Sequence, residues 1–181
     1  AIRKTIEECA QLSEDNNLPG WRQSSYNIKT LKKQYRFIQK LKHSTSKDEA
    51  KRQAHEVAIK QAHQDYLDQA EAFLERARAT RLLVNRQTVI SLTLFTDLDN
   101  YIIHAKRQIQ QINSRVLQGK AIPHEEKVFS IFQPHTEWIS KGKAGVPMEL
   151  GLRVCVLEDR NGFILHHRVM QNETDDKVAV S

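Results

Sequence analysis

The sequence contains little cysteine, glycine or proline, and it has no long apolar run. Its 181 residues include two Cys, six Gly and four Pro. Cys9 and Cys155 provide neither a disulfide framework nor metal-ligand spacing, so a reducing compartment is expected. Because the chain also lacks an apolar stretch of bilayer length and a signal-peptide core, we predict a cytoplasmic protein that does not contact membranes.

Motifs for nucleophilic catalysis, nucleotide binding and zinc binding are missing as well. There is no Gly-x-Ser-x-Gly elbow, and Gly142-Lys143 lacks the upstream glycine and the following Ser or Thr of a P-loop. Eight histidines are present, but none has zinc-site spacing, and His166 and His167 point to opposite faces of a predicted strand. We therefore predict no metal ligands in this chain.

What the sequence does contain is positive charge. The net charge is +6 and the pI is about 9.4, which is typical of proteins that bind polyanions, with nucleic acid as the first candidate. Residues 22–52 contain ten Lys or Arg residues against only Asp48 and Glu49. This basic block is predicted to face DNA, although a merely solvated helix face is the alternative. The DNA-binding residues predicted on it are Lys29, Lys32, Lys33 and Arg36.

Helical periodicity dominates the first 120 residues. A short helix is predicted over residues 1–16, and the run Asn16 to Gly20 ends it. Ser25 is the predicted N-cap of a second helix. The apolar stripe of this second helix consists of Ile28, Leu31, Tyr35 and Ile38.

Two long helices are expected next. The first covers residues 47–83, with a capping box made by Ser46 and Glu49. Its stripe is mostly alanine: Ala50, Ala54, Ala58, Ala62, Tyr66, Ala70, Phe73 and Ala77. The second runs to about Gln118, with Gly119 at its C-terminal cap. It carries a heptad seam of Phe95, Leu98, Ile102, Ala105, Ile109, Ile112 and Val116. A short connection favours an antiparallel intramolecular hairpin over a dimerising coiled coil.

From Lys127 onward the periodicity changes to that of strands. Residues 128–132 are predicted to be extended. One strand alternates Leu150, Leu152, Val154 and Val156, with Cys155 buried within it. A tight Asn161-Gly162 turn leads to the return strand, because both residues tolerate positive φ. The alternating positions of the return strand are Phe163, Leu165, His167 and Val169.

A basic loop precedes this hairpin. Lys141 and Lys143 flank a flexible glycine and are predicted to contact successive DNA phosphates, with a loop that is basic by chance as an equal alternative. The acidic pairs have structural explanations. Glu158-Asp159 belongs to the hairpin turn, and Asp175-Asp176 begins a predicted helix.

The ordered series of segments from residue 122 to residue 181 resembles the DDE transposases of bacterial insertion sequences, most closely the ISNCY group. The segments that carry the resemblance are Lys127-Val128-Phe129-Ser130-Ile131, Glu137-Trp138-Ile139, Lys141-Gly142-Lys143-Ala144, Gly162-Phe163-Ile164-Leu165 and Glu173-Thr174-Asp175. The long helices are similar, less specifically, to the helical insertion of that group. The resemblance implies an α+β chain in which residues 1–120 form a helical insertion and residues 121–181 form part of a ribonuclease-H-like core.

The resemblance also implies a function and a cofactor. In that family three acidic residues hold two Mg²⁺ or Mn²⁺ ions for DNA cleavage and strand transfer, and the complete enzyme can form a homo-oligomer on the transposon ends. None of the three acids maps onto this chain, so we expect a segment of a longer protein that is catalytically silent by itself. Asp175 is expected to begin the first core helix.

Two other functions remain open on the sequence. One is a non-enzymatic nucleic-acid-binding or assembly module built on the heptad hairpin. The other is a purely structural role in self-association.

Overall fold

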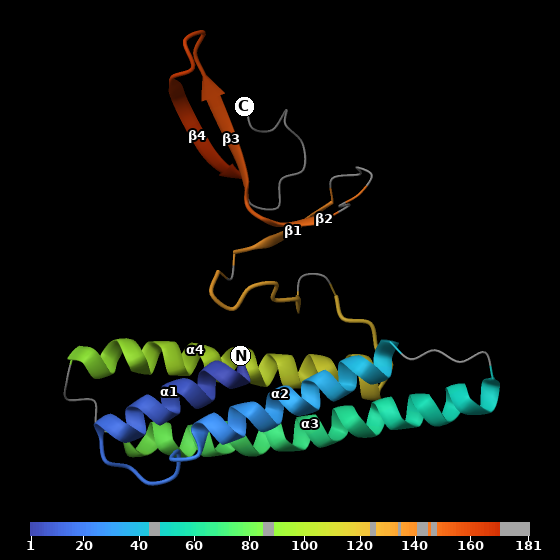
Figure 1. Ribbon diagram of the computed structural model, residues 1–181. Helices are drawn as coiled ribbons and strands as arrows, with labels where there is room; N and C mark the ends of the chain where they lie inside the picture. The colour runs from blue at the N-terminus through green and yellow to red at the C-terminus, as the bar shows by residue number, and fades with distance from the viewer. Residues whose placement is uncertain are drawn as a thin grey trace. The chain divides into compact units, whose positions relative to one another are not determined.

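The computed structural model describes residues 1–43, 48–84, 89–123, 126–133, 135–140, 145 and 148–170. The chain divides into two compact units, Ala1–His124 and Glu125–Ser181. The first unit is helical and the second contains two separate antiparallel sheets of two strands each, so the fold is α+β (Figure 1). These four described strands do not form a ribonuclease-H-like sheet.

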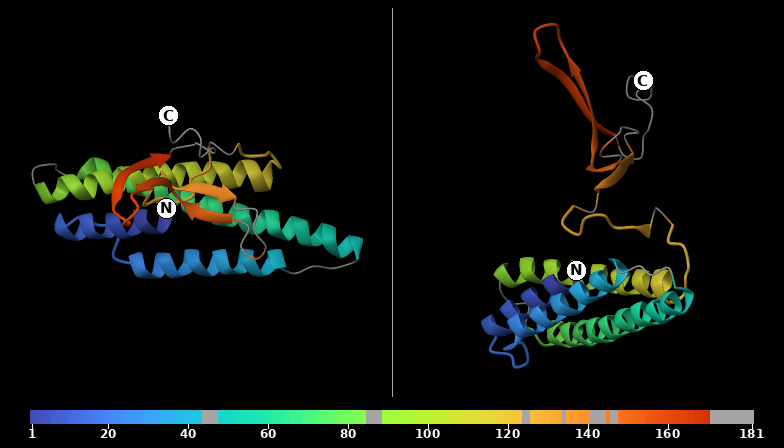
Figure 2. Two further views of the ribbon diagram at one scale, coloured as in Figure 1. Left: turned by 90° about the horizontal axis from the view of Figure 1, so that it is seen from above. Right: turned by 45° about the vertical axis from the view of Figure 1, so that its right-hand side comes forward.

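Four helices pack together in the first unit. They are α1 (Ile2–Asp15), α2 (Ser24–His43), α3 (Glu49–Leu83) and α4 (Val89–Ile112), and α4 continues into a π-helical turn, η1 (Asn113–Leu117). Helices α3 and α4 form the predicted intramolecular hairpin, α1 packs against both of them, and α2 packs mainly against α3 (Figure 1, Figure 2). No described helix is both long and apolar enough to cross a bilayer.

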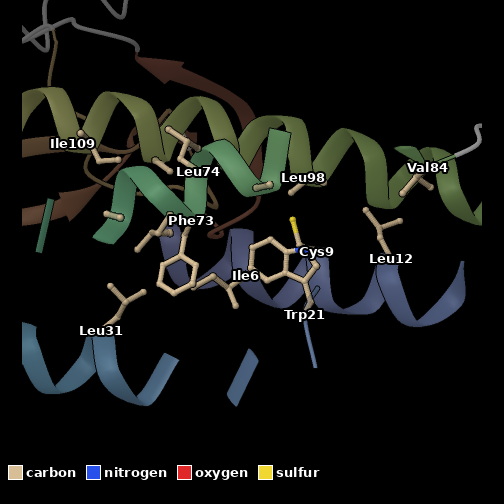
Figure 3. Packing of buried hydrophobic residues seen from close by; sticks show 14 of the residues in the cluster. Ile6, Cys9, Leu12, Trp21, Leu31, Phe73, Leu74, Val84, Leu98 and Ile109 are labelled. Atoms are coloured by element: carbon tan, nitrogen blue, oxygen red, sulfur yellow. The ribbon is translucent and has the colours of Figure 1, made fainter. Parts of the chain in front are cut away.

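The heptad seam predicted for the second long helix faces the helical core over most of its length, with Ile102 and Ile112 partly buried and Val116 in η1. Phe95, Leu98, Ala105 and Ile109 are buried. They pack with residues from α1 and α3 in one continuous cluster (Figure 3). Its members from α1 and α3 include Ile6, Cys9, Leu12, Leu67, Phe73, Leu74 and Ala77.

Trp21 is a core residue that the periodicity of the sequence did not identify. It lies between α1 and α2, is 3% exposed and packs in the cluster shown in Figure 3. Its indole Nε1 donates a 2.8 Å hydrogen bond to Oγ1 of Thr80 on α3. Its ring lies 6.3 Å from that of Phe73 and 4.3 Å below the guanidinium carbon of Arg76. Trp21 therefore attaches the α1–α2 connection to α3.

The alanine stripe of α3 is buried only in its second half. Ala62, Ala70 and Ala77 lie in the core, whereas Ala50, Ala54 and Ala58 are exposed. Leu67 and Leu74, together with His63 and Thr80, are also buried, although none of them was in the predicted stripe. Alanine buries too little apolar area to require a partner helix by itself.

Two predicted helix caps are wrong. Helix α3 begins at Glu49, and the side chain of Asp48 accepts hydrogen bonds from the backbone N–H groups of Ala50 and Lys51, so Asp48 replaces the predicted Ser46, which lies outside the described residues. Helix α2 begins at Ser24, which places Ser25 inside the helix. Aspartate caps as well as serine does because its carboxylate accepts the same orphan N–H groups.

The other end of the helical unit follows the prediction more closely. Gly119 has φ +69°, the left-handed conformation expected after a helix C-terminus. The unpredicted feature is the π-helical turn, in which the N–H of Gln118 donates to the carbonyl of Asn113, five residues back. This wider turn ends α4 and closes with a bond from the N–H of Lys120 to the carbonyl of Ser114.

The strand predicted from Leu150 to Val156 is divided in two. Strand β2 (Met148–Gly151) pairs with β1 (Glu137–Ser140), whereas β3 (Arg153–Glu158) pairs with β4 (Ile164–Met170), visible as the orange-red hairpin in Figure 2. The prediction of a single hairpin therefore missed β1. Alternation of side chains persists through a change of pairing partner, so it does not reveal the break at Leu152.

The hairpin turn is wider than the predicted Asn-Gly turn. Only Gly162 has positive φ, at +84°, so the turn is not of the type that requires positive φ at both central residues. Instead, Oδ1 of Asp159 accepts hydrogen bonds of 2.8 Å from the N–H groups of Asn161 and Phe163. The acidic residue of the turn therefore has the structural role predicted for it.

The described part of residues 126–133 contains bends rather than the predicted extended segment. Oγ of Ser130 accepts hydrogen bonds from the backbone N–H groups of Phe132 and Gln133. A serine hydroxyl that bonds the backbone two and three residues ahead favours a turn and competes with strand pairing.

The two cysteines differ in burial and should differ in reactivity. Burial raises the pKa of the Cys9 thiol to about 12, and Cys9 is fully buried, whereas Cys155 is only partly buried, contrary to the prediction. Since the thiolate is the reactive species, a maleimide reagent should modify Cys155 in the native protein and Cys9 only after unfolding. Peptide mass spectrometry identifies the labelled residue. Labelling of Cys9 at the same rate would contradict the packing of α1.

Candidate nucleic-acid interface

Helix α2 places the predicted DNA-binding residues on one exposed face. Its only fully buried side chains are Leu31 and Ile38, which are seven residues apart and therefore share one side of the helix. At about 100° per residue, Lys29, Lys33 and Arg36 project from the opposite side, and Lys32 lies at its margin. All four cations are exposed. The structure thus brings these predicted residues together.

Lys40 extends this surface by one more turn. It is exposed and lies seven residues after Lys33. We call the surface formed by Lys29, Lys32, Lys33, Arg36 and Lys40 the α2 cationic face. At about 1.5 Å per residue it is roughly 16 Å long. That length matches several phosphates of a nucleic-acid backbone, because duplex DNA carries one charge per about 1.7 Å of its axis.

Helix α2 contains no acidic residue. Its cations therefore have no carboxylate on their own helix to pair with, unlike several cations of α3. On α3, Arg52 pairs with Glu49 at 3.0 Å and Lys60 pairs with Glu56 at 2.9 Å. The hydrogen bond from Lys60 lowers the pKa of Glu56. The positive charge of Lys60 is therefore compensated by a carboxylate on the same helix. Among the residues that the structure describes, no carboxylate forms an ion pair with the α2 cationic face.

The structure therefore divides the basic block of residues 22–52. Its two acids, Asp48 and Glu49, lie at the start of α3 and pair with Lys51 and Arg52. Of the eight other cations of the block, six lie on α2 and Arg22 lies in the turn before it, while Lys47 falls outside the described residues. The sequence count alone did not show where the two acids act.

Helix stability does not account for the α2 cationic face. Cations in the last turn, such as Lys40, interact favourably with the helix dipole, but Lys29, Lys32 and Lys33 lie in the first half of α2. Every cation of the face has another cation three or four residues away. Each such like-charge pair destabilises a helix by about 0.2–0.5 kcal/mol. A bound polyanion would relieve this repulsion.

An apolar ring lies within this surface. Phe37 is 55% exposed and lines a shallow hollow of about 470 Å³ together with the five cations of the α2 cationic face. A second shallow hollow, which shares Arg36 and Lys40 with the first, is lined also by Gln39 and His43. Phe37 was not among the residues predicted to bind DNA. Its signal was a position four residues after Lys33, one turn along the cationic side.

The other predicted DNA contacts come from the basic loop before the hairpin, and the resemblance also implies bound metal ions. Lys141 and Lys143 lie outside the described residues, as does Asp175. Within the described ranges, no group of three His, Cys, Asp or Glu side chains converges as ligands for a metal ion. These residues therefore do not form the two-metal site of a DDE enzyme, and we derive no metal-dependent step for this chain.

Comparisons of the chain with models of known protein families, with curated proteins and with solved structures found no match. These comparisons therefore identify no function, and the resemblance to transposases stays a prediction.

Proposed function

We propose that this chain is a DNA-binding segment of a DDE transposase of the insertion-sequence type and acts in the cytoplasm. The α2 cationic face carries the proposal, because it holds five exposed cations without an acidic residue on its helix. The face binds the phosphate backbone and contributes affinity and orientation rather than sequence selectivity. Lys141 and Lys143 are proposed to add phosphate contacts from the second unit.

The finer fold assignment belongs to the same proposal. The β3–β4 hairpin is proposed to supply two strands of a ribonuclease-H-like core that is completed by chain outside this sequence. The acids that hold Mg²⁺ or Mn²⁺, and hence the cleavage and strand-transfer chemistry, are proposed to lie there too. In this arrangement the described helices bind DNA, and homo-oligomerisation is a property of the complete enzyme.

A non-enzymatic assembly module is the second candidate, and the exposed apolar residues of the β3–β4 hairpin favour it. Val154 and Val169 pair across the two strands and are 51% and 44% exposed. An isolated two-stranded hairpin is marginally stable in water, so this face is suited to covering by further protein. Such covering does not explain the charge of α2, so the assembly module stays the second candidate.

The test is the salt dependence of DNA binding. The chain should bind a fluorescently labelled 20-base-pair duplex at 50 mM salt. If four or five phosphates are contacted, log K should fall with log salt concentration with a slope of about −3 to −5. Fluorescence anisotropy over 50–300 mM salt measures that slope. Absence of binding at 50 mM salt would overturn the DNA-binding proposal, and self-association without DNA binding would favour the assembly module.

A further inference from the structure

The surroundings of Phe37 point to a more specific substrate than duplex DNA. We infer that the α2 cationic face takes single-stranded DNA, with an unpaired base stacked on Phe37 and the flanking phosphates on the surrounding cations. The inference rests on the proposed DNA-binding function and specifies the form of DNA that this site binds.

The chemical environment of the ring carries the inference. A single exposed apolar residue is ordinary on a protein surface, but Phe37 shares its hollow with Lys29, Lys32, Lys33, Arg36 and Lys40. Sites for single strands combine these two elements, an aromatic ring for the base and cations that follow the backbone. In a duplex the flat faces of the bases are stacked on each other, so a backbone-binding helix leaves Phe37 without a partner.

The position of Phe37 on α2 also fits this role. The residue that follows it, Ile38, is 4% exposed and packs towards the bundle, whereas Phe37 itself is 55% exposed. An aromatic side chain has few rotatable bonds, so fixing it against a base costs little conformational entropy. Lys33 and Lys40 lie about one turn before and one turn after Phe37 and line the same hollow, so the two phosphates next to a stacked base remain within their reach.

Tyr35 supplies a matched control. It lies on the same helix and is 54% exposed, close to the value for Phe37. Its hydroxyl, however, contributes to raising the pKa of Tyr66 on α3, after the larger effect of burial. At about 100° per residue, Tyr35 lies on the side of α2 that carries Leu31 and Ile38, and it does not line the hollow around Phe37.

The experiment measures the affinities of the full chain for a labelled 12-nucleotide oligo-dT, for an oligonucleotide of equal length with abasic sites, and for a duplex. Phe37→Leu should weaken binding of oligo-dT by about 5- to 100-fold, as expected for the loss of one stacked base. Phe37→Trp keeps an aromatic ring at this position and should bind oligo-dT as tightly as the wild type. Binding of the abasic strand and of the duplex should not change, because both keep their phosphates but offer no free base. Tyr35→Leu should leave all three affinities at wild-type values.

The outcomes separate this inference from the proposed function. If the wild-type chain binds the duplex as tightly as oligo-dT, and Phe37→Leu changes neither affinity, the stacking inference is wrong while DNA binding stands. Equal losses for Phe37→Leu and Tyr35→Leu would also refute it. If the wild-type chain binds none of the three ligands, the proposed function and the inference fall together. Circular dichroism of each variant verifies that α2 is still folded.

Discussion

Replacing Lys29, Lys32, Lys33 and Arg36 together with glutamine should lower the affinity for DNA by about 100-fold or more at 50 mM salt. Each lost phosphate contact should also reduce the magnitude of the salt slope by about one. The four side chains are exposed and lie opposite the buried stripe of α2, so the fold should persist. Removing their mutual repulsion should even stabilise α2 slightly. Anisotropy titrations at several salt concentrations measure both quantities.

The control for this variant is a second quadruple substitution with the same change in net charge. Lys51, Arg52, Lys60 and Arg78 are cations of α3 that pair with carboxylates on the same helix or at its N-cap. Their replacement with glutamine should leave the salt slope near its wild-type value, because each cation is already compensated locally. Similar losses of affinity in the two variants would mean that only the total charge matters. The α2 cationic face would then lose its special role.

Trp21→Ala should destabilise the helical unit by about 3–5 kcal/mol, the range for removing a large buried aromatic side chain. The substitution leaves a cavity beside Phe73 and removes the hydrogen bond to Thr80 and the contact with Arg76. Such a loss is a large part of the total stability of an ordinary domain. Urea unfolding followed by circular dichroism at 222 nm reports the free energy of unfolding, because the α-helices of the described residues all lie in this unit.

The chain contains a natural control for that measurement in its second tryptophan. Trp138 lies on β1 and is 45% exposed, with its ring 5.5 Å from that of Phe129. Trp138→Ala should leave helix unfolding within about 0.5 kcal/mol of wild type. Trp21→Phe should have an intermediate effect, since it keeps most of the aromatic volume and loses the indole N–H. Equal effects of the two alanine variants would show that Trp21 does not connect the helices as described.

Helices were predictable where many side chains repeat the same spacing. Phe95, Leu98, Ala105 and Ile109 specify the buried side of α4 together, so an error at one position does not change the result. Trp21 could not be found in this way, because its partner Thr80 is 59 residues away in the chain. A contact of that range depends on how the helices meet, which local periodicity does not contain.

The strands were harder to predict for a different reason. Alternation around Leu152 specifies which side chains share a face, but it does not specify which strand is the partner. The interface was predictable in one respect only. The spacing of Lys29, Lys33 and Arg36 placed them on one exposed face, whereas Phe37 is a single residue without periodic support. Its significance becomes visible only once its exposure and the hollow around it are known.

The helix that holds the cationic face buries fewer of its residues than α1 and α3 do. Of its twenty residues, only Leu31 and Ile38 are fully buried, whereas the 14-residue α1 buries six. Local opening is easiest where few apolar contacts must be broken. A ligand that binds only the folded form of α2 would shift this opening equilibrium towards the folded helix. Binding at this surface would then be coupled to the folding of α2. The measured affinity would be lower than the intrinsic affinity for the folded helix.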